Sequence, residues 1–317
     1  MERGRVSVIL PSRNEQFLPQ TVGSLLGNAR GDVEIVAVLE GYWPDPPLPD
    51  DPRLIVLHRG RAQGMRPAIN AGMECATGEW LMKLDAHCGV SEGWDLVLKA
   101  ECDADEVVVP RRLRLDPFTW TLTDQHKVPI DAHYLSYPFE RPGDASCGLH
   151  GTKWDARSKA RAHVLVDEEM SSQGSCWFTS RRHWEGRLRP MDVVRYGNFI
   201  QEFQEIGLRT WLSGGRCLVN KKCWYAHWHK GKHGRGYFIS KSEQAFGADA
   251  ATRYWMTDAW PTSEGRVRTL QWLVERFSPV PGWPADLDAA FRDARARLRA
   301  PEPAGAAPSL TSVAPGA

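Results

Sequence analysis

The sequence predicts an α/β fold in which a mostly parallel central sheet is flanked by helices and followed by a helical C-terminal extension. Two observations predict it. Over residues 1–110, short apolar runs rich in β-branched residues alternate with segments of helical spacing, which is typical of a parallel sheet covered on both faces. From residue 237 onward the spacing is helical, without intervening strands.

The elements of the first half are bounded by turn residues. Residues 5–10 (RVSVIL) form the first strand, which ends at Pro11, and the run from Ser12 to Glu15 offers a helix start. A stretch rich in Pro and Asp, residues 43–52, separates the second and third strands. Further strands are expected at 33–39, 53–57, 79–84 and 106–109, and helices at 16–27, 65–76 and 91–102.

The second half is less regular. Residues 110–170 lack clear periodicity, and so long a stretch is more often a functional loop region than a linker. Beyond it we expect strands at 174–179, 215–219 and 223–228, and helices at 197–208, 237–256, 265–277 and 285–299. The predicted organisation is a main domain over 1–235 with halves 1–110 and 111–235, a helical extension over 236–300, and a disordered tail over 301–317.

The composition is that of a globular protein. Of 317 residues, 42% are hydrophobic and 25% charged, and the formal net charge of +1 creates no global field toward nucleic acid or membranes. The seven cysteines form no CxxC pair, which favours free thiols. No apolar run approaches the roughly 20 residues that span a bilayer, and Met1 runs directly into a strand. We therefore expect a cytoplasmic protein without integral membrane association.

The chemistry is expected where the fourth strand ends, at Leu84-Asp85-Ala86-His87. Ligands of open α/β sheets bind beyond the carboxyl ends of the strands, and residues two apart on an extended chain project to the same side. Asp85 and His87 could therefore chelate one divalent cation, which would neutralise a diphosphate leaving group. The alternative is that Asp85 caps the next segment and His87 makes a hydrogen bond within a loop.

At these residues the sequence resembles the GT-A fold glycosyltransferases, especially family 2 enzymes and the polypeptide N-acetylgalactosaminyltransferases. The resemblance is carried by Asp85-Ala86-His87-Cys88 with Glu92-Gly93-Trp94, by the run from Val6 to Glu15, and by Arg66, Asn70, Ala71 and Gly72 with Ala76-Thr77-Gly78-Glu79. It implies a Rossmann-like sheet and a nucleotide-sugar donor, with a UDP-sugar expected. The donor-binding residues that it implies are Pro11, Arg13, Glu15, Glu40, Arg66, Asn70 and Asp85.

Two of these donor residues have competing interpretations. Glu40 ends the second strand, where the resembled enzymes usually have an Asp that contacts the uracil and ribose. The alternative is an ordinary carboxylate at a strand end. The resemblance places Arg66 near the diphosphate, and its position at the start of a helix favours an anion contact. The alternative is a solvated charge on a helix.

An acidic helix is expected in the second half. Residues 174–179 (GSCWFT) resemble the strand that lines the acceptor side of the site, and the run from Tyr196 to Gly207 resembles the acidic helix that precedes a Gly-Gly-Arg turn, here residues 214–216. On that match Glu202 falls on the position of the catalytic base, although the triplet Gln201-Glu202-Phe203 departs from the usual Glu-Asp pair.

Glu202 and Glu205 are three residues apart and share a helix face. We expect Glu202 to deprotonate the acceptor hydroxyl and Glu205 to orient a substrate or anchor the helix. A base that works near neutral pH needs burial, which raises the pKa of a carboxylate, to offset a nearby cation, which lowers it. The alternative is a surface helix with two solvated glutamates.

The run from Trp224 to Lys230 resembles the late strand that supplies a third metal ligand in the N-acetylgalactosaminyltransferases. The resemblance implies this role for His227, with His229 as the fallback on the same strand face. An Asp/His/His ligand set suits Mn²⁺, with Mg²⁺ as the alternative. The competing interpretation is an aromatic strand with incidental histidines.

Basic residues interleaved with aromatic ones can follow a phosphate backbone and stack on an unpaired base. The first such group is Lys221, Lys222, Lys230, Lys232, His233, Arg235 and Lys241, and the second is Lys153, Arg157, Lys159 and Arg161. The alternative is that these residues bind the donor diphosphate or are solvated. The expected acceptor contacts are Trp177, Trp211, Lys221, Lys222, Trp224, His229 and Lys230.

The runs from Tyr134 to Pro142 and from Asn220 to His227 resemble bacteriophage family 2 enzymes. This implies a 5-hydroxymethylpyrimidine of phage DNA as acceptor, flipped out or single-stranded, and the host cytoplasm as the location of a phage-encoded protein. The alternative acceptors are a polysaccharide, a lipid-linked sugar or protein Ser/Thr.

Two other classes of protein compete with a glycosyltransferase. One is an inactive GT-A module that binds carbohydrate or nucleic acid. The other is a metal-dependent nucleotidyltransferase, whose Gly-rich basic loop is missing from the run Pro11 to Glu15.

Overall fold

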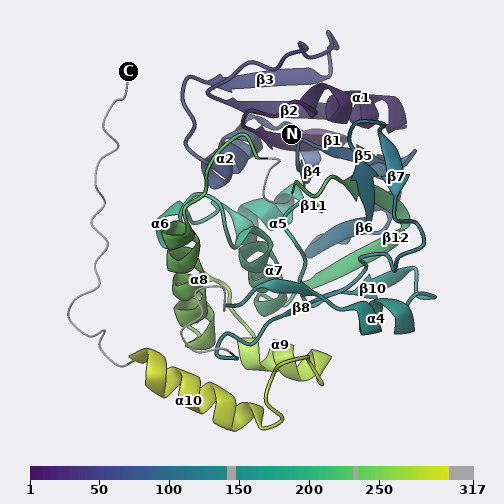
Figure 1. Ribbon diagram of the computed structural model, residues 1–317. Helices are drawn as coiled ribbons and strands as arrows, with labels where there is room; N and C mark the ends of the chain where they lie inside the picture. The colour runs from purple at the N-terminus through teal and green to yellow at the C-terminus, as the bar shows by residue number, and fades with distance from the viewer. Residues whose placement is uncertain (141–147, 231–234, 300–317) are drawn as a thin grey trace.

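The computed structural model describes residues 1–140, 148–230 and 235–299. In this part of the chain a 10-stranded sheet runs through the molecule with helices on both faces (Figure 1). The strand order is β10-β12-β6-β11-β4-β1-β2-β3, with β5 paired to β12 and β7 to β6. The predicted α/β fold class is confirmed.

The first half of the sheet is parallel. β1 (Glu2–Ser12) pairs with β2 (Val33–Glu40) on one side and with β4 (Gly78–Leu84) on the other, and β2 pairs with β3 (Leu54–Arg59). Every residue of β2 is buried, as expected for a continuous apolar strand that is covered on both faces. Parallel pairing brings the carboxyl ends of these strands to one edge of the sheet.

The helices between these strands cover opposite faces. α1 (Leu18–Asn28) packs beside α3 (Trp94–Ala100), where the Trp94 indole donates to the carbonyl of Leu25. α2 (Met65–Cys75) packs on β1 and β2 from the other face, because the crossover from β3 to β4 runs opposite in direction to that from β1 to β2. A Cβ at Gly72 of α2 would lie 2.5 Å from a methyl group of β1, so this close approach requires glycine.

The second half of the sheet is mixed, whereas a mostly parallel sheet was expected. β11 (Cys176–Ser180) is antiparallel to both β4 and β6 (Glu106–Asp116), while β12 (Arg216–His227) is parallel to β6. The long irregular segment between β6 and β11 lets the chain return in the opposite direction without a helical crossover. The two strands expected after residue 214 form the single strand β12, whose register with β6 shifts between Asn220 and Trp224.

The helix expected at 197–208 begins later, at Glu202, and ends at Leu212 as α7. Gln201 has a left-handed backbone with φ of 62°, and Gly197 has φ of 72°, so a right-handed helix cannot run through these positions. Glu202 and Glu205 consequently lie in the first turn of α7.

Short elements lie within and around the irregular region and near the C-terminal helices. They are β5 (Cys88–Val90), β7 (Thr121–Thr123), β8 (His133–Leu135), β9 (Gly151–Lys153), β10 (Val166–Glu168), α4 (Asp155–Ala160), α5 (Arg181–His183), a π-helical turn (Trp184–Leu188), α6 (Val193–Tyr196) and a 3₁₀ turn (Thr262–Glu264). β8 and β9 pair with each other in a separate small sheet.

The helical C-terminal extension is confirmed. It consists of α8 (Lys241–Met256), α9 (Leu270–Phe277) and α10 (Leu287–Arg299); α9 and α10 lie at the lower end of the molecule in Figure 1, and α8 runs along its left side. Their buried residues belong to the same hydrophobic core as α7. The predicted tail, 301–317, lies outside the described residues. Among the described helices, none combines the length and the apolar character that a membrane crossing requires.

Candidate active site

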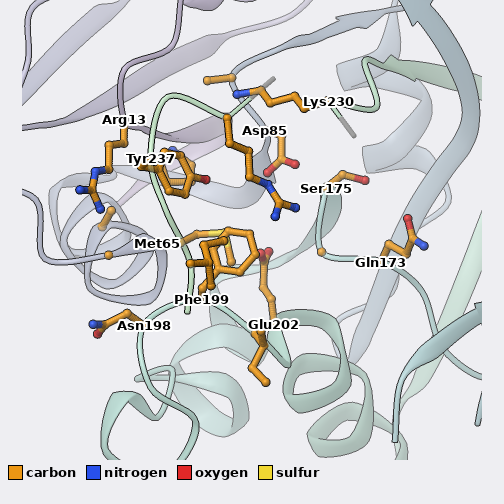
Figure 2. A pocket seen from close by; sticks show the side chains of 18 of the residues that line it. Arg13, Met65, Asp85, Gln173, Ser175, Asn198, Phe199, Glu202, Lys230 and Tyr237 are labelled. Carbon is orange, nitrogen blue, oxygen red and sulfur yellow. The ribbon is translucent and has the colours of Figure 1, made fainter. Parts of the chain in front are cut away.

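A cavity of about 860 Å³ lies at the carboxyl ends of β1, β2 and β4, where ligand binding was predicted. Figure 2 shows Arg13, Asp85, Glu202 and Tyr237 around it. These residues come from the end of β1, the end of β4, the start of α7 and the segment before α8. The cavity is therefore assembled from both halves of the sequence.

The sheet brings three candidate metal ligands together at this cavity. Asp85 follows β4, and the pairing of β5 with β12 sets His227 opposite Cys88, next to His87. The two Nε2 atoms of the histidines are 3.1 Å apart, and Asp85 Oδ2 lies 3.2 Å from that of His227 and 3.9 Å from that of His87. Donor atoms so spaced can share one ion at bond lengths of roughly 2.1 Å.

The outer nitrogens of both imidazoles have partners. His87 Nδ1 lies 3.0 Å from Glu15 Oε2, so it holds the proton and leaves Nε2 free to coordinate. His227 Nδ1 accepts from Arg112 at 3.1 Å, because a guanidinium only donates. Its Nε2 proton then points to Asp85, and coordination of an ion through Nε2 would require this proton to move to Nδ1 and Arg112 to turn away from that nitrogen. Burial lowers the pKa of His227 to about 3, which keeps this imidazole neutral.

Lys83 links the metal triad to the predicted base. Its side chain is fully buried, and its Nζ lies 2.5 Å from Asp85 Oδ1 and 3.1 Å from Glu202 Oε2. The same ammonium also donates to the carbonyl of Gly174. The other oxygen of Glu202 accepts from the Trp177 indole at 2.8 Å. Asp85 and Glu202, which are far apart in sequence, are thus held by one cation.

The charges of this network follow from burial and pairing. Burial alone would raise the pKa of Asp85, but the Lys83 ammonium and the hydrogen bond from His227 hold it well below its usual range. Burial raises the pKa of Glu202, and the attraction of Lys83 offsets this only in part. Burial would lower the pKa of Lys83, yet the two carboxylates raise it above its ordinary value. Lys83 therefore remains an ammonium.

Three of the expected catalytic and donor-binding residues do not line the cavity. Arg66 and Glu205 pair with each other, with both side chains fully buried, and Arg66 also donates to the carbonyl of Ile200. Asn70 exchanges hydrogen bonds with the backbone of Met191. Glu205, in the first turn of α7, thus meets Arg66 of α2, and both side chains lie outside the lining of the cavity.

Glu40 lies at the cavity with its carboxylate 3% exposed, where a contact to the base was expected. Its Oε2 accepts the backbone N–H groups of Gln63 and Gly64, both at 2.6 Å. Its Oε1 lies 3.0 Å from Arg59 and has no hydrogen-bond partner. Glu40 therefore fixes the turn before α2 with one oxygen and faces Arg59 with the other.

The other expected donor residues follow β1, the strand next to β2. Pro11, Arg13 and Glu15 all line the cavity. The guanidinium of Arg13 lies 5.1 Å from the centre of the Tyr237 ring, and Glu15 pairs with Lys230 as well as with His87. These contacts connect the turn after β1 to the segment that follows β12.

The expected acceptor residues divide into three groups. His229 and Lys230 line the cavity. Trp177 and Trp211 are completely buried in the core. Three others are placed elsewhere on β12, outside the lining of the cavity: Lys221 donates to the carbonyl of Arg161, Lys222 pairs with Glu101, and Trp224 lies near Ser91. Lys232 and His233 lie outside the described residues.

Several residues at the site were not expected from the sequence, namely Lys83, Arg112, Gln173, Ser175 and Tyr237. A signal for Lys83 was present, because a lysine in an otherwise apolar strand needs a buried partner. No sequence pattern marked Arg112, whose position is set by the pairing of β6 with β12.

Comparisons with known proteins agree with this fold. Residues 7–182, more than half of the chain, match the family described as Glycosyl transferase family 2. A structure described as GalNAc-T7 with UDP, GalNAc and Mn²⁺ is 16% identical, with a TM-score of 0.63, over 86% of this chain and 56% of that one. At this identity the likeness shows the fold alone.

Two curated relatives are polypeptide N-acetylgalactosaminyltransferases by name. A probable form 8 from Homo sapiens is 24% identical over 52% of this chain, and a putative form 13 from Drosophila melanogaster is 26% identical over 68%. The matches cover 24% and 40% of those proteins, so this chain spans less than half of their length. The family match and the shared fold lead to one conclusion: the chain belongs to glycosyl transferase family 2.

Proposed function

We propose that this protein is a metal-dependent glycosyltransferase that moves a sugar from a nucleotide-sugar, with UDP as the expected nucleotide, to a hydroxyl acceptor. The observation that carries the proposal is the triangle of Asp85, His87 and His227 at the cavity. An oxygen and two imidazole nitrogens suit Mn²⁺, with Mg²⁺ as the alternative. When bound, such an ion would supply Lewis-acid stabilisation of the leaving diphosphate.

Residues that line the cavity are proposed to bind the nucleotide and its diphosphate. Glu40 is the proposed contact to the nucleotide, because it lines the cavity and fixes the turn before α2 through the N–H groups of Gln63 and Gly64. Arg13 and Lys230 bring positive charge to the wall beside Glu15. Lys230 pairs with Glu15, which also contacts His87, so its ammonium is linked to the metal triad through one carboxylate.

Glu202 is the proposed base. It lines the cavity, and its raised pKa makes it a better proton acceptor than an ordinary carboxylate. Each carboxylate oxygen can accept two hydrogen bonds, so the contacts with Trp177 and Lys83 leave room for an acceptor hydroxyl. Glu205 is assigned an anchoring role through Arg66.

The test is a titration of the protein with UDP in the presence of Mn²⁺, followed by assays for release of UDP from a panel of UDP-sugars. We expect UDP to bind only with the ion, and chelation by EDTA to abolish both binding and turnover. If Mn²⁺ and UDP together leave the calorimetric signal and the unfolding temperature unchanged, the proposal fails.

For the acceptor we propose the hydroxyl of a 5-hydroxymethylpyrimidine in DNA. Lys230 and Arg235 support this choice, because they bring positive charge to the cavity that His229 also lines. The measurement is the mass of oligonucleotides that contain 5-hydroxymethylcytosine or 5-hydroxymethyluracil after incubation with each UDP-sugar and Mn²⁺. If no sugar is added while UDP still binds, a polysaccharide, a lipid-linked sugar or protein Ser/Thr replaces DNA as the proposed acceptor.

A further inference from the structure

Lys83 contacts two carboxylates of the site, those of Asp85 and Glu202. Asp85 has two oxygens, and each faces a different cation site. Oδ1 lies 2.5 Å from the Lys83 ammonium, whereas Oδ2 lies 3.2 Å from His227 at the metal triangle. Lys83 therefore occupies one side of this carboxylate and turns the other toward the histidines.

The same ammonium also holds Glu202. Oε2 of Glu202 lies 3.1 Å from Lys83, and Oε1 accepts from the Trp177 indole. Both donors come from within the core, since Lys83 and Trp177 are completely buried. A glutamate tied in this way keeps its position at the cavity without approaching the metal triangle.

We propose that Lys83 is a positioning residue that restricts Asp85 to coordination through one oxygen and keeps Glu202 out of the metal's ligand set. This inference depends on the proposed function, because it assigns an ion to the triangle. The physical reason is competition between cations. A buried carboxylate needs a compensating charge, and Lys83 supplies it to both acids without an ion.

Competition between Lys83 and the metal ion for the two carboxylates predicts an effect that a general loss of structure would not produce. If Lys83 loses its charge, two buried carboxylates lose the cation that they share, and a divalent ion at the triangle can replace it. Without the Lys83 ammonium, this lysine no longer repels the ion, and the carboxylates of Asp85 and Glu202 are no longer paired with it. Both changes favour binding of the ion. Mn²⁺ should then bind more tightly while transfer becomes slower, because Glu202 and Asp85 no longer hold their working positions.

The experiment measures Mn²⁺ binding to the full-length protein by electron paramagnetic resonance, without nucleotide, and UDP release from the best UDP-sugar separately. For Lys83→Met we expect the dissociation constant of Mn²⁺ to fall by about tenfold and turnover to fall by about 100-fold. Lys83→Gln removes the charge but keeps a polar end, and we expect the same opposite changes should Lys83→Met fold poorly.

The matched control is Arg66→Met, which removes the other fully buried cation that pairs with α7. Arg66 contacts neither Asp85 nor Glu202 in the described hydrogen bonds and ion pairs, so Mn²⁺ affinity of the folded control should stay within about threefold of the original. A second comparison is Lys83→Arg, which keeps the charge and should not tighten Mn²⁺ binding.

Unchanged or weaker Mn²⁺ binding in both neutral variants overturns the proposal, and so does equal tightening in Lys83→Arg. These outcomes are separate from failure of the proposed function. If the unsubstituted protein binds neither Mn²⁺ nor UDP with Mn²⁺, the metal-dependent transferase itself is rejected. If it binds both and the neutral variants do not tighten the ion, only the role of Lys83 is rejected.

Discussion

Two buried cations hold the first turn of α7, and they differ in what lies beside them. Arg66 pairs with Glu205 in a fully buried contact away from the cavity, whereas Lys83 pairs with Glu202 at the cavity and also reaches Asp85. The two glutamates are three residues apart on one helix. Their partners come from α2 and β4, which lie in different layers of the fold.

The difference shows that burial of an ion pair does not reveal its role. Both pairs remove charge from water, and each would leave an uncompensated charge if one partner were lost. Only the pair formed by Lys83 shares a carboxylate with the metal triangle. We therefore expect substitutions of Lys83 and its partners to change metal binding and transfer activity, and substitutions of Arg66 to change the free energy of unfolding.

The strongest test removes the shared carboxylate. Asp85→Ala deletes one metal ligand and leaves Lys83 paired with Glu202 alone, so we expect Mn²⁺ affinity to fall by more than about 100-fold and UDP release to become undetectable. Calorimetric titration of Mn²⁺ and the UDP assay provide the two measurements. Near-normal turnover in this variant would show that the triangle is not the metal site.

The next test separates the two glutamates. Glu202→Gln keeps the size of the side chain but cannot take a proton, so transfer to the acceptor should fall by about 100- to 10,000-fold while UDP still binds with Mn²⁺. The matched control is Glu205→Gln, which should retain transfer activity per folded molecule. Equal losses of transfer in both variants would contradict the different roles assigned to Glu202 and Glu205.

A third test addresses the buried pair of Arg66 and Glu205. Arg66→Met leaves Glu205 buried without its cation, and we expect the free energy of unfolding to fall by about 3–5 kcal/mol. Urea denaturation followed by tryptophan fluorescence measures this change. If Arg66 instead binds the diphosphate, the same variant should lose UDP affinity with little loss of stability, and that result would restore the interpretation based on the sequence.

The smallest effect is expected at an exposed ion pair. Lys222 and Glu101 pair at the surface, where solvent screens the attraction, so Lys222→Ala should change the free energy of unfolding by less than about 1 kcal/mol. UDP binding should also be unaffected, because Lys222 does not line the cavity. A large loss of acceptor transfer in this variant, measured with UDP binding intact, would return Lys222 to the acceptor site.

Much of the donor half could be predicted because its signals are local. The strand that ends at Leu84 and the spacing of Asp85 and His87 placed two candidate ligands at one sheet edge, and β4 does end there. His227 was expected from resemblance alone, and the pairing of β5 with β12 brings it next to His87. These features depend on strand ends, which sequence patterns mark well.

The parts that could not be predicted depend on long-range pairing. The single strand β12 was divided in two because the shift in its register is a property of the contact with β6. Trp177 and Trp211 were expected at the acceptor, but their burial in the core is decided by how α7 packs on the sheet. An aromatic residue in a sequence does not show which of its neighbours will cover it.

By itself, the sequence determined the alternating layers, the edge of the sheet where ligands bind, and the presence of Asp85, His87 and Glu202 in the chemistry-bearing segments. Only the tertiary structure decided which carboxylate each buried cation pairs with. Lys83 and Arg66 look alike in sequence as cations near apolar residues, yet one meets the metal triangle and the other meets Glu205. The reason is that a buried charge must be neutralised within a few ångströms, and chain topology alone determines which carboxylate lies within that distance.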